Sequence, residues 1–160
     1  MRRVLLVAIP LLFVALLVLF HVLPKSDYRM NFSRLEVETA TLYLSSESAE
    51  SGKKALTAET DLDALYELMN GLRLQGKYRD RDIPDGGHFL GIEFQLTDGS
   101  TVLFSYLQTS QYGRGYFTDG KQYFEASKLN LLDFWYALDG EVQPFESGET
   151  EMFPYIWQER

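Results

Sequence analysis

Three aspartates, Asp80, Asp82 and Asp85, lie close together in a polar stretch and are followed by Gly86. Carboxylate oxygens on a loop suit calcium, and a helix-loop-helix calcium loop needs acids at its first, third and fifth positions, glycine at the sixth and glutamate at the twelfth. Here the third acid comes one residue late, and Gly91 occupies the twelfth position. We therefore expect a solvated turn, with no metal and no other cofactor.

His88 is the only histidine outside the N-terminal apolar segment, and it follows Asp85 closely. A general base and its orienting carboxylate need these residue types, but the sequence has no Gly-x-Ser-x-Gly motif to supply an aligned serine. We predict that the protein is not an enzyme. A cell-envelope hydrolase that uses His88 with Asp82 or Asp85 is the alternative.

Tyrosines are dense in the second half of the chain. Their rings pair a flat apolar face with a hydroxyl group, which suits sugars and extended peptides, although packing in a core is the competing explanation. An arginine between two glycines could bind a carboxylate or phosphate, or the glycines could simply shape a hairpin loop. The candidate ligand-binding residues are Tyr106, Tyr112, Arg114, Tyr116 and Tyr123.

An apolar segment, residues 4–23, contains no Asp, Glu, Lys or Arg. As a helix it would cover roughly 30 Å, the thickness of the hydrocarbon core of a bilayer. A cleaved signal peptide is the alternative, but such signals have shorter apolar regions and a small-residue cleavage site that is missing here. Arg2 and Arg3 precede the segment and favour an inside N-terminus. We predict a single-pass signal-anchor in the cell membrane and an extracytoplasmic C-terminal domain.

The rest of the chain is acidic and free of cysteine. Fifteen Lys and Arg stand against 23 Asp and Glu, and Arg2 and Arg3 precede the apolar segment, which leaves a net charge of −10 beyond it. Nucleic acid is excluded as a partner, because its binders need a basic stripe. The lack of cysteine excludes disulfides, thiolate metal sites and an acylated cysteine anchor.

The first elements expected after the apolar segment are a strand and a helix. Residues 34–44 alternate as a strand with one wet face, and the small polar residues 45–54 predict a loop. Thr57 or Thr60 can cap an amphipathic helix that ends near Gly71. Its apolar residues are Leu62, Leu65, Met69 and Leu72.

An antiparallel meander follows the polar stretch 75–88. Two Asp-Gly pairs, Asp98-Gly99 and Asp119-Gly120, supply the positive φ that tight turns require. Ser127 can cap a final helix that Gly140 closes. The four predicted strands are 90–96, 101–107, 115–118 and 122–125.

These elements predict an α+β fold in the order β-α-β-β-β-β-α, with two amphipathic helices on one face of an antiparallel sheet. The predicted organisation is an anchor at 1–25, a linker at 26–33, the domain at 34–140 and an acidic, aromatic tail at 141–160.

The pattern over residues 34–138 resembles small membrane-tethered or lipoprotein domains of unknown function from Gram-positive bacteria. The features that carry the resemblance are the tether, R-D-I-P-D at 81–85 and the aromatic strand D-G-K-Q-Y-F-E at 119–125. Many such proteins begin with a lipobox cysteine, which this chain lacks. The resemblance implies an extracytoplasmic location and supplies no catalytic residues.

Together these features predict a membrane-anchored, non-enzymatic domain that binds or senses a ligand or an envelope protein at the cell surface. Binding is expected through the meander face and the loops 75–88 and 108–115. Besides the hydrolase, an accessory subunit of a membrane complex is an alternative, in which the anchor helix forms part of the contact.

Overall fold

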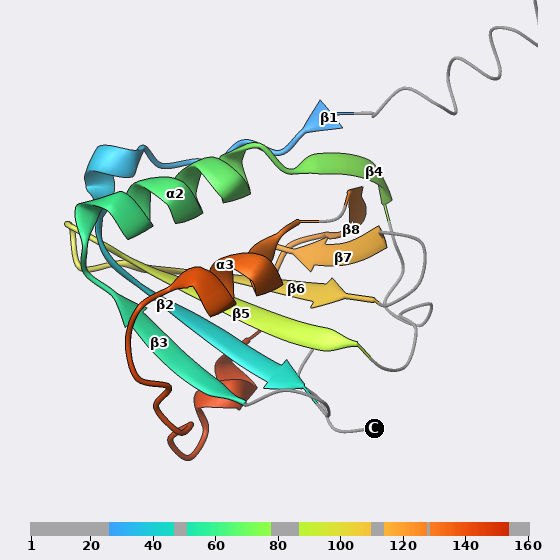
Figure 1. Ribbon diagram of the computed structural model, residues 1–160. Helices are drawn as coiled ribbons and strands as arrows, with labels where there is room; N and C mark the ends of the chain where they lie inside the picture. The colour runs from blue at the N-terminus through green and yellow to red at the C-terminus, as the bar shows by residue number, and fades with distance from the viewer. Residues whose placement is uncertain (1–25, 47–50, 78–86, 110–113, 128, 154–160) are drawn as a thin grey trace, which may run out of the picture.

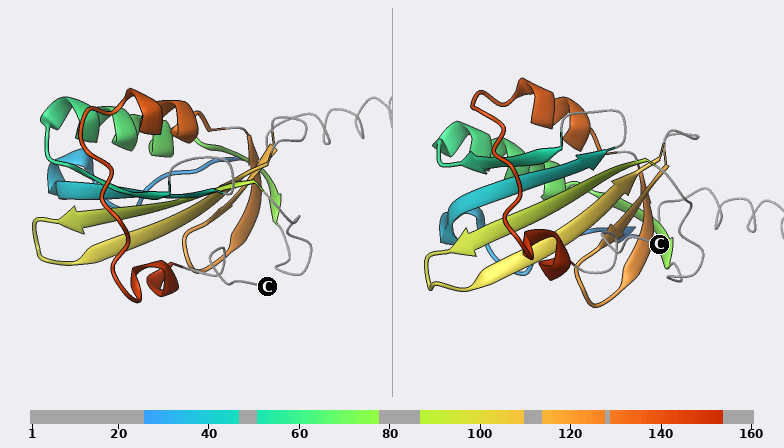
Figure 2. Two further views of the ribbon diagram at one scale, coloured as in Figure 1. Left: turned by 60° about the horizontal axis from the view of Figure 1, so that its bottom comes forward. Right: turned by 90° about the horizontal axis from the view of Figure 1, so that it is seen from below.

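The computed structural model describes residues 26–46, 51–77, 87–109, 114–127 and 129–153 (Figure 1). They form one antiparallel sheet with two α-helices on one of its faces, which confirms the predicted α+β class (Figures 1 and 2). The predicted anchor lies outside the described residues. Within those residues, no helix is both long enough and apolar enough to cross a membrane.

The sheet has eight strands in the order β1-β4-β8-β7-β6-β5-β2-β3, and every neighbouring pair is antiparallel. The helices are α2 (Glu59–Asn70) and α3 (Leu131–Ala137), and the short 3-10 helices are η1 (Arg34–Glu36) and η3 (Glu149–Met152). The strands are β1 (Ser26–Asp27), β2 (Val37–Ser46), β3 (Gly52–Leu56), β4 (Arg73–Lys77), β5 (His88–Leu96), β6 (Thr101–Gln108), β7 (Arg114–Thr118) and β8 (Tyr123–Ser127).

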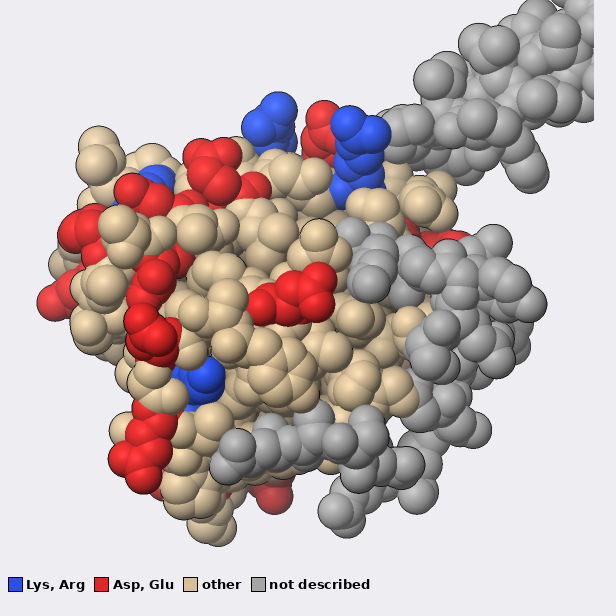
Figure 3. Space-filling model, viewed as in Figure 1, with Lys and Arg blue, Asp and Glu red and all other residues tan. Residues whose placement is uncertain are grey.

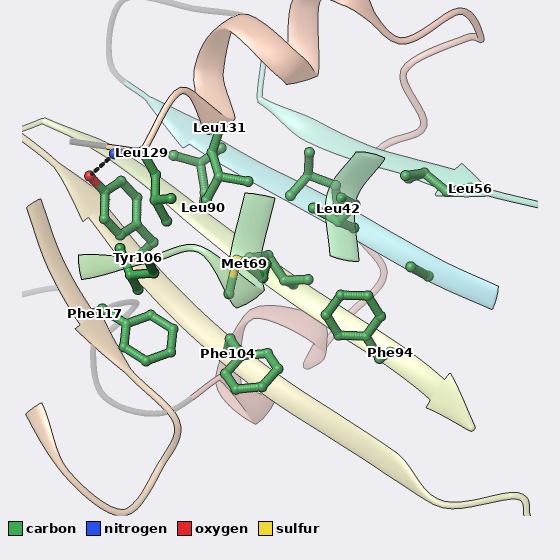
Figure 4. Close-up of a cluster of buried hydrophobic side chains, with 14 of the residues drawn as sticks. Leu42, Leu56, Met69, Leu90, Phe94, Phe104, Tyr106, Phe117, Leu129 and Leu131 are labelled. Carbon is green, nitrogen blue, oxygen red and sulfur yellow. Dashed lines mark hydrogen bonds between the residues drawn. The ribbon is translucent and has the colours of Figure 1, made fainter. Parts of the chain in front are cut away.

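The hydrophobic core lies between the sheet and the two helices (Figure 4). Alternate strand residues share a face, so Leu42, Ile92 and Phe104 stand side by side across β2, β5 and β6. The helices bury their apolar stripes against this face. Their buried residues are Leu62, Leu65 and Met69 of α2, and Leu131 and Trp135 of α3.

Strand β3 corrects the prediction of a loop over residues 45–54. β2 runs on to Ser46, and β3 returns along it with Gly52, Lys54 and Leu56 turned toward the core. The alternation of inward and outward residues is not apparent in the sequence, because Lys53 and Lys54 are adjacent. Lys54 is buried because its ammonium donates to the carbonyl oxygens of Trp135 at 3.1 Å and Leu138 at 2.9 Å.

The predicted helix caps are also wrong in detail. The N-cap of α2 is Ala58, without a side-chain bond, in place of Thr57 or Thr60, whereas Gly71 ends the helix as predicted. Ser127 belongs to β8 and does not cap α3, which begins after Asn130 and ends before Leu138. The polar stretch predicted at 75–88 contains the last residues of β4 and the start of β5, and residues 78–86 lie outside the described part of the chain.

Residues 26–33, for which a linker is expected, contribute to the fold. β1 pairs with β4, and the backbone N–H of Tyr28 donates to the carbonyl of Leu72 at 2.7 Å. Phe32 is buried in the core, where its backbone carbonyl accepts the hydroxyl of Tyr66 at 2.8 Å. The chain entering from the N-terminal side is thereby fixed along the end of α2.

The tail residues 142–153, here called the C-terminal strap, pass the edge strand β3 and reach the sheet face opposite the helices (Figure 2). Gln143 forms a bridge with Lys53, and the rings of Phe145 and Phe153 pack on Tyr43. The ring of Phe153 lies over Gly91, where a Cβ atom would come within 2.7 Å of it. The strap therefore covers one end of this second face.

Candidate functional site

Strands β6 and β7 separate partway along their length. β6 pairs with β5 from Gln108 to Thr101, but its pairing with β7 stops at Ser105, opposite Thr118. The first four residues of β6, 101–104, therefore have a strand neighbour on one side only. Figure 2 shows the β5–β6 turn and the β7–β8 turn pointing apart.

Local hydrogen bonds close the β7–β8 turn just beyond the last β6–β7 pair. The Thr118 hydroxyl oxygen accepts the N–H of Gly120 at 3.0 Å, and Asp119 Oδ1 accepts the N–H groups of Lys121 at 3.0 Å and Gln122 at 3.1 Å. Gly120 has φ +81°, which favours glycine. These N–H groups are therefore satisfied within the turn itself.

A cleft of about 570 Å³ opens where the strands separate. Its volume lies within the range of ligand-binding pockets. Three parts of the chain far apart in sequence meet there: the N-terminal segment, the start of β6 with the β7–β8 turn, and the strap. The lining residues are Tyr28, Arg29, Asn31, Thr101, Val102, Leu103, Phe104, Asp119, Gly120, Lys121 and Met152.

The cleft has an apolar floor and a polar rim. Tyr28 packs edge-on against Phe104 and Phe117, with ring centroids 6.0 and 4.8 Å away. Its hydroxyl points toward Asp119 Oδ2 at 3.5 Å. Burial and the Asp119 carboxylate together raise the pKa of the Tyr28 hydroxyl, so this group stays a neutral donor at physiological pH.

Two cations mark the rim of the cleft within a strongly acidic domain. Arg29 and Lys121 are both exposed, and the single acid of the lining, Asp119, already bonds its own turn and faces Tyr28. Elsewhere carboxylates gather over the start of α2 and after α3 (Figure 3). The lining thus carries two exposed cations against one acid, which suits an acidic ligand.

Tyr106, which the sequence suggests as a ligand-binding residue, is buried in the core. Its side chain is 0% exposed, and its hydroxyl oxygen accepts the N–H of Leu129 at 2.9 Å (Figure 4). Burial raises its pKa to about 12. A Cβ atom at Gly115 would lie within 2.5 Å of this ring. Gly115 is therefore needed to leave room for the Tyr106 side chain, and its backbone does not adopt a positive φ.

Tyr116 and Tyr123 do not share a sheet face with Tyr106. Tyr116 and Tyr123 lie half-buried on the opposite face of the sheet, paired across strands with Glu125 and Thr118. Tyr112 and the side chain of Arg114 lie outside the described part of the structure, so the proposed role of these two residues stays a prediction.

His88 contacts a serine. Its Nδ1 lies 2.8 Å from Ser46 Oγ, across the β2–β5 pair. Asp80, Asp82 and Asp85 lie outside the described residues, so neither the predicted turn nor a carboxylate beside His88 can be placed. Among the residues that are described, no group of three or more His, Asp or Glu could hold a metal ion.

Sequence reasoning missed the cleft, although one signal was present. The predicted strand 101–107 is longer than its partner 115–118, which implies that part of it extends beyond the meander. The approach of Tyr28 and Arg29 from the N-terminal segment and of Met152 from the strap has no local sequence signal, because it depends on long-range packing.

Comparison with protein-family models, with curated proteins and with solved structures gave no match, so the site rests on its own geometry.

Proposed function

We propose that this chain is a single-pass membrane protein whose extracytoplasmic domain binds a ligand or protein at the cell surface, without enzymatic activity. The observation that carries the proposal is the cleft between β6 and the β7–β8 turn. It combines an apolar floor with a few converging polar groups, which is the usual composition of a binding site. The resemblance to membrane-tethered domains of Gram-positive bacteria agrees with this role.

The position of the cleft suits a partner near the membrane. Tyr28 and Arg29 line it, and both follow soon after the predicted anchor. A domain tethered so closely keeps this cleft near the bilayer surface. The acidic surface elsewhere disfavours contact with anionic lipid, whereas the two rim cations attract an acidic partner.

Photo-crosslinking in intact cells tests this function. A photoreactive amino acid is placed at Thr101, which is exposed and lines the cleft, in the full-length chain. We expect a discrete crosslinked product that weakens when Lys121→Glu is added. The matched control carries the photoreactive residue at Thr57, which is exposed but outside the cleft lining. No product from Thr101, or the same products from both sites, would contradict cleft binding.

The hydrolase is retained as a second candidate because Ser46 Oγ lies within hydrogen-bond distance of His88. A serine activated by a histidine is the minimum for nucleophilic catalysis. If this pair is catalytic, Ser46→Ala and His88→Ala must each abolish hydrolysis of a panel of ester and peptide substrates by the folded full-length chain. We expect no hydrolysis by the native protein above the level of either variant.

A further inference from the structure

The unpaired stretch of β6 presents backbone groups to the cleft, and the β5–β6 turn shows which ones. The N–H of Leu96 donates to the carbonyl of Ser100 at 2.8 Å, and the carbonyl of Leu96 accepts the N–H of Gly99 at 2.9 Å. Leu96 therefore directs its backbone groups toward β6. Successive strand residues point to opposite sides, so Gln95 faces β2 and Phe94 faces β6 again.

The same alternation fixes the direction of the β6 groups. Phe94 stands opposite Val102, so Val102 and Phe104 bond to β5. Thr101 and Leu103 then direct their N–H and C=O groups away from β5, into the cleft. No backbone group in the described ranges pairs with them there.

We propose that the cleft binds an extended, acidic peptide segment of another protein, which pairs with Thr101 and Leu103 and adds a strand to β6. This inference rests on the proposed function and specifies its ligand class. Main-chain pairing to a free strand edge gives affinity, and side-chain contacts at alternate positions give specificity. Arg29 and Lys121 at the rim select acidic side chains.

Side chains beside the free edge suit this occupant. Val102 and Leu103 are only partly buried and point to opposite faces of the sheet, so a strand placed along β6 finds apolar contacts on both faces. A free edge is also a liability for self-association. A second copy of the chain is therefore the competing occupant that the experiment must separate.

The test selects random displayed peptides on the full-length chain in detergent micelles and measures the affinity of the enriched peptides. The key pair of variants is Leu103→Pro, which removes the N–H directed into the cleft, and Leu103→Val, which keeps it. We expect enriched peptides to be acidic, to bind Leu103→Val like the native chain, and to bind Leu103→Pro about tenfold more weakly. Lys121→Glu should weaken binding, and Lys77→Glu, at an exposed lysine outside the lining, should not.

Three results would overturn strand addition. If Leu103→Pro and Leu103→Val bind equally while Lys121→Glu weakens binding, the cleft binds peptides by another route and the proposed function stands. If all variants bind equally, the proposed site falls as well. A concentration-dependent dimer that competes with the peptide would place a second copy in the cleft.

If Leu103→Pro fails to fold, changes to the peptide test main-chain pairing with the native chain instead. Methylation of alternate backbone nitrogens of an enriched peptide removes its donors to one side. One methylated register should lose at least about tenfold in affinity for the native chain, and the other register should not. Equal affinities of both registers, or no enrichment of any peptide, would contradict main-chain pairing.

Discussion

At the scale of single residues, two buried side chains from the sheet hold both ends of α3. The hydroxyl of Tyr106 accepts the N–H of Leu129 just before the helix, and Lys54 donates to the carbonyls of Trp135 and Leu138 at its end. The Lys54 ammonium also lies 5.2 Å from the centre of the Trp135 ring. A helix of seven residues is too short to be stable alone, so α3 depends on these contacts and on its packing.

Lys54→Met keeps the length of the side chain but leaves two buried carbonyl groups without their donor. We expect the free energy of unfolding to fall by about 2 kcal/mol, the cost of losing hydrogen bonds from a charged group. Urea denaturation of the full-length chain measures it. Lys77→Met is the control, because Lys77 is exposed, and it should change stability by less than about 0.5 kcal/mol. If the two variants lose the same free energy of unfolding, the hydrogen bonds of Lys54 do not stabilise the fold.

Gly115→Ala tests the packing of Tyr106. The new Cβ would overlap the ring, which must move from its place in the core, so we expect a loss of about 2–3 kcal/mol. Gly76→Ala is the matched strand glycine, with no atom within 4 Å of the position of its Cβ. It should leave stability nearly unchanged. If both variants are equally stable, the close approach of Tyr106 to Gly115 is incorrect.

At the scale of elements, the pattern of alternating residues and Asp-Gly turns was sufficient to predict the meander, and apolar spacing predicted α2. It was not sufficient for β3, whose inward positions include Gly52 and Lys54. From the sequence alone Lys54 is expected to be exposed, because the carbonyl groups of Trp135 and Leu138 that it bonds come from a distant part of the chain. β4 was missed because Leu74 is its one fully apolar inward residue. The cleft depends on where the β6–β7 pairing stops, which only the folded register determines.

The C-terminal strap is held by ion pairs that respond to acid. Lys53 Nζ lies 3.0 Å from Glu146 and also bonds Glu149. Partial desolvation of the Glu149 carboxylate acts to raise its pKa. The hydrogen bond from Lys53 acts in the opposite direction, and the pKa of Glu149 lies below its ordinary value. This interaction therefore stabilises the strap above the ordinary pKa of a glutamate and is lost as pH falls through the lowered one. Solvent exposure limits its contribution to roughly 0.5 kcal/mol.

We expect the aromatic NMR signals of Phe153 to report looser packing on Tyr43 below about pH 4. In Lys53→Met the same signals should indicate a looser strap at neutral pH and change little with acid. An acid response of equal size in both proteins would show that another group holds the strap.

At the scale of the whole molecule, an acidic domain with a cleft and two rim cations follows the predicted anchor. β1 begins at Ser26, directly after the predicted anchor, and pairs with the edge strand β4. With the anchor in a bilayer, this edge and the nearby cleft lie close to the membrane surface. The proposed partner of the cleft is another membrane protein or an envelope component held close to the bilayer.

Protease treatment of intact cells tests the proposal that the domain faces outward from the cell. The full-length chain is followed before and after lysis, with a cytoplasmic protein as the control for cell integrity. We predict that the domain is digested in intact cells while the cytoplasmic control is spared. A domain that stays intact until lysis, and is then digested, would contradict the outward orientation and move the partner of the cleft to the cytoplasm.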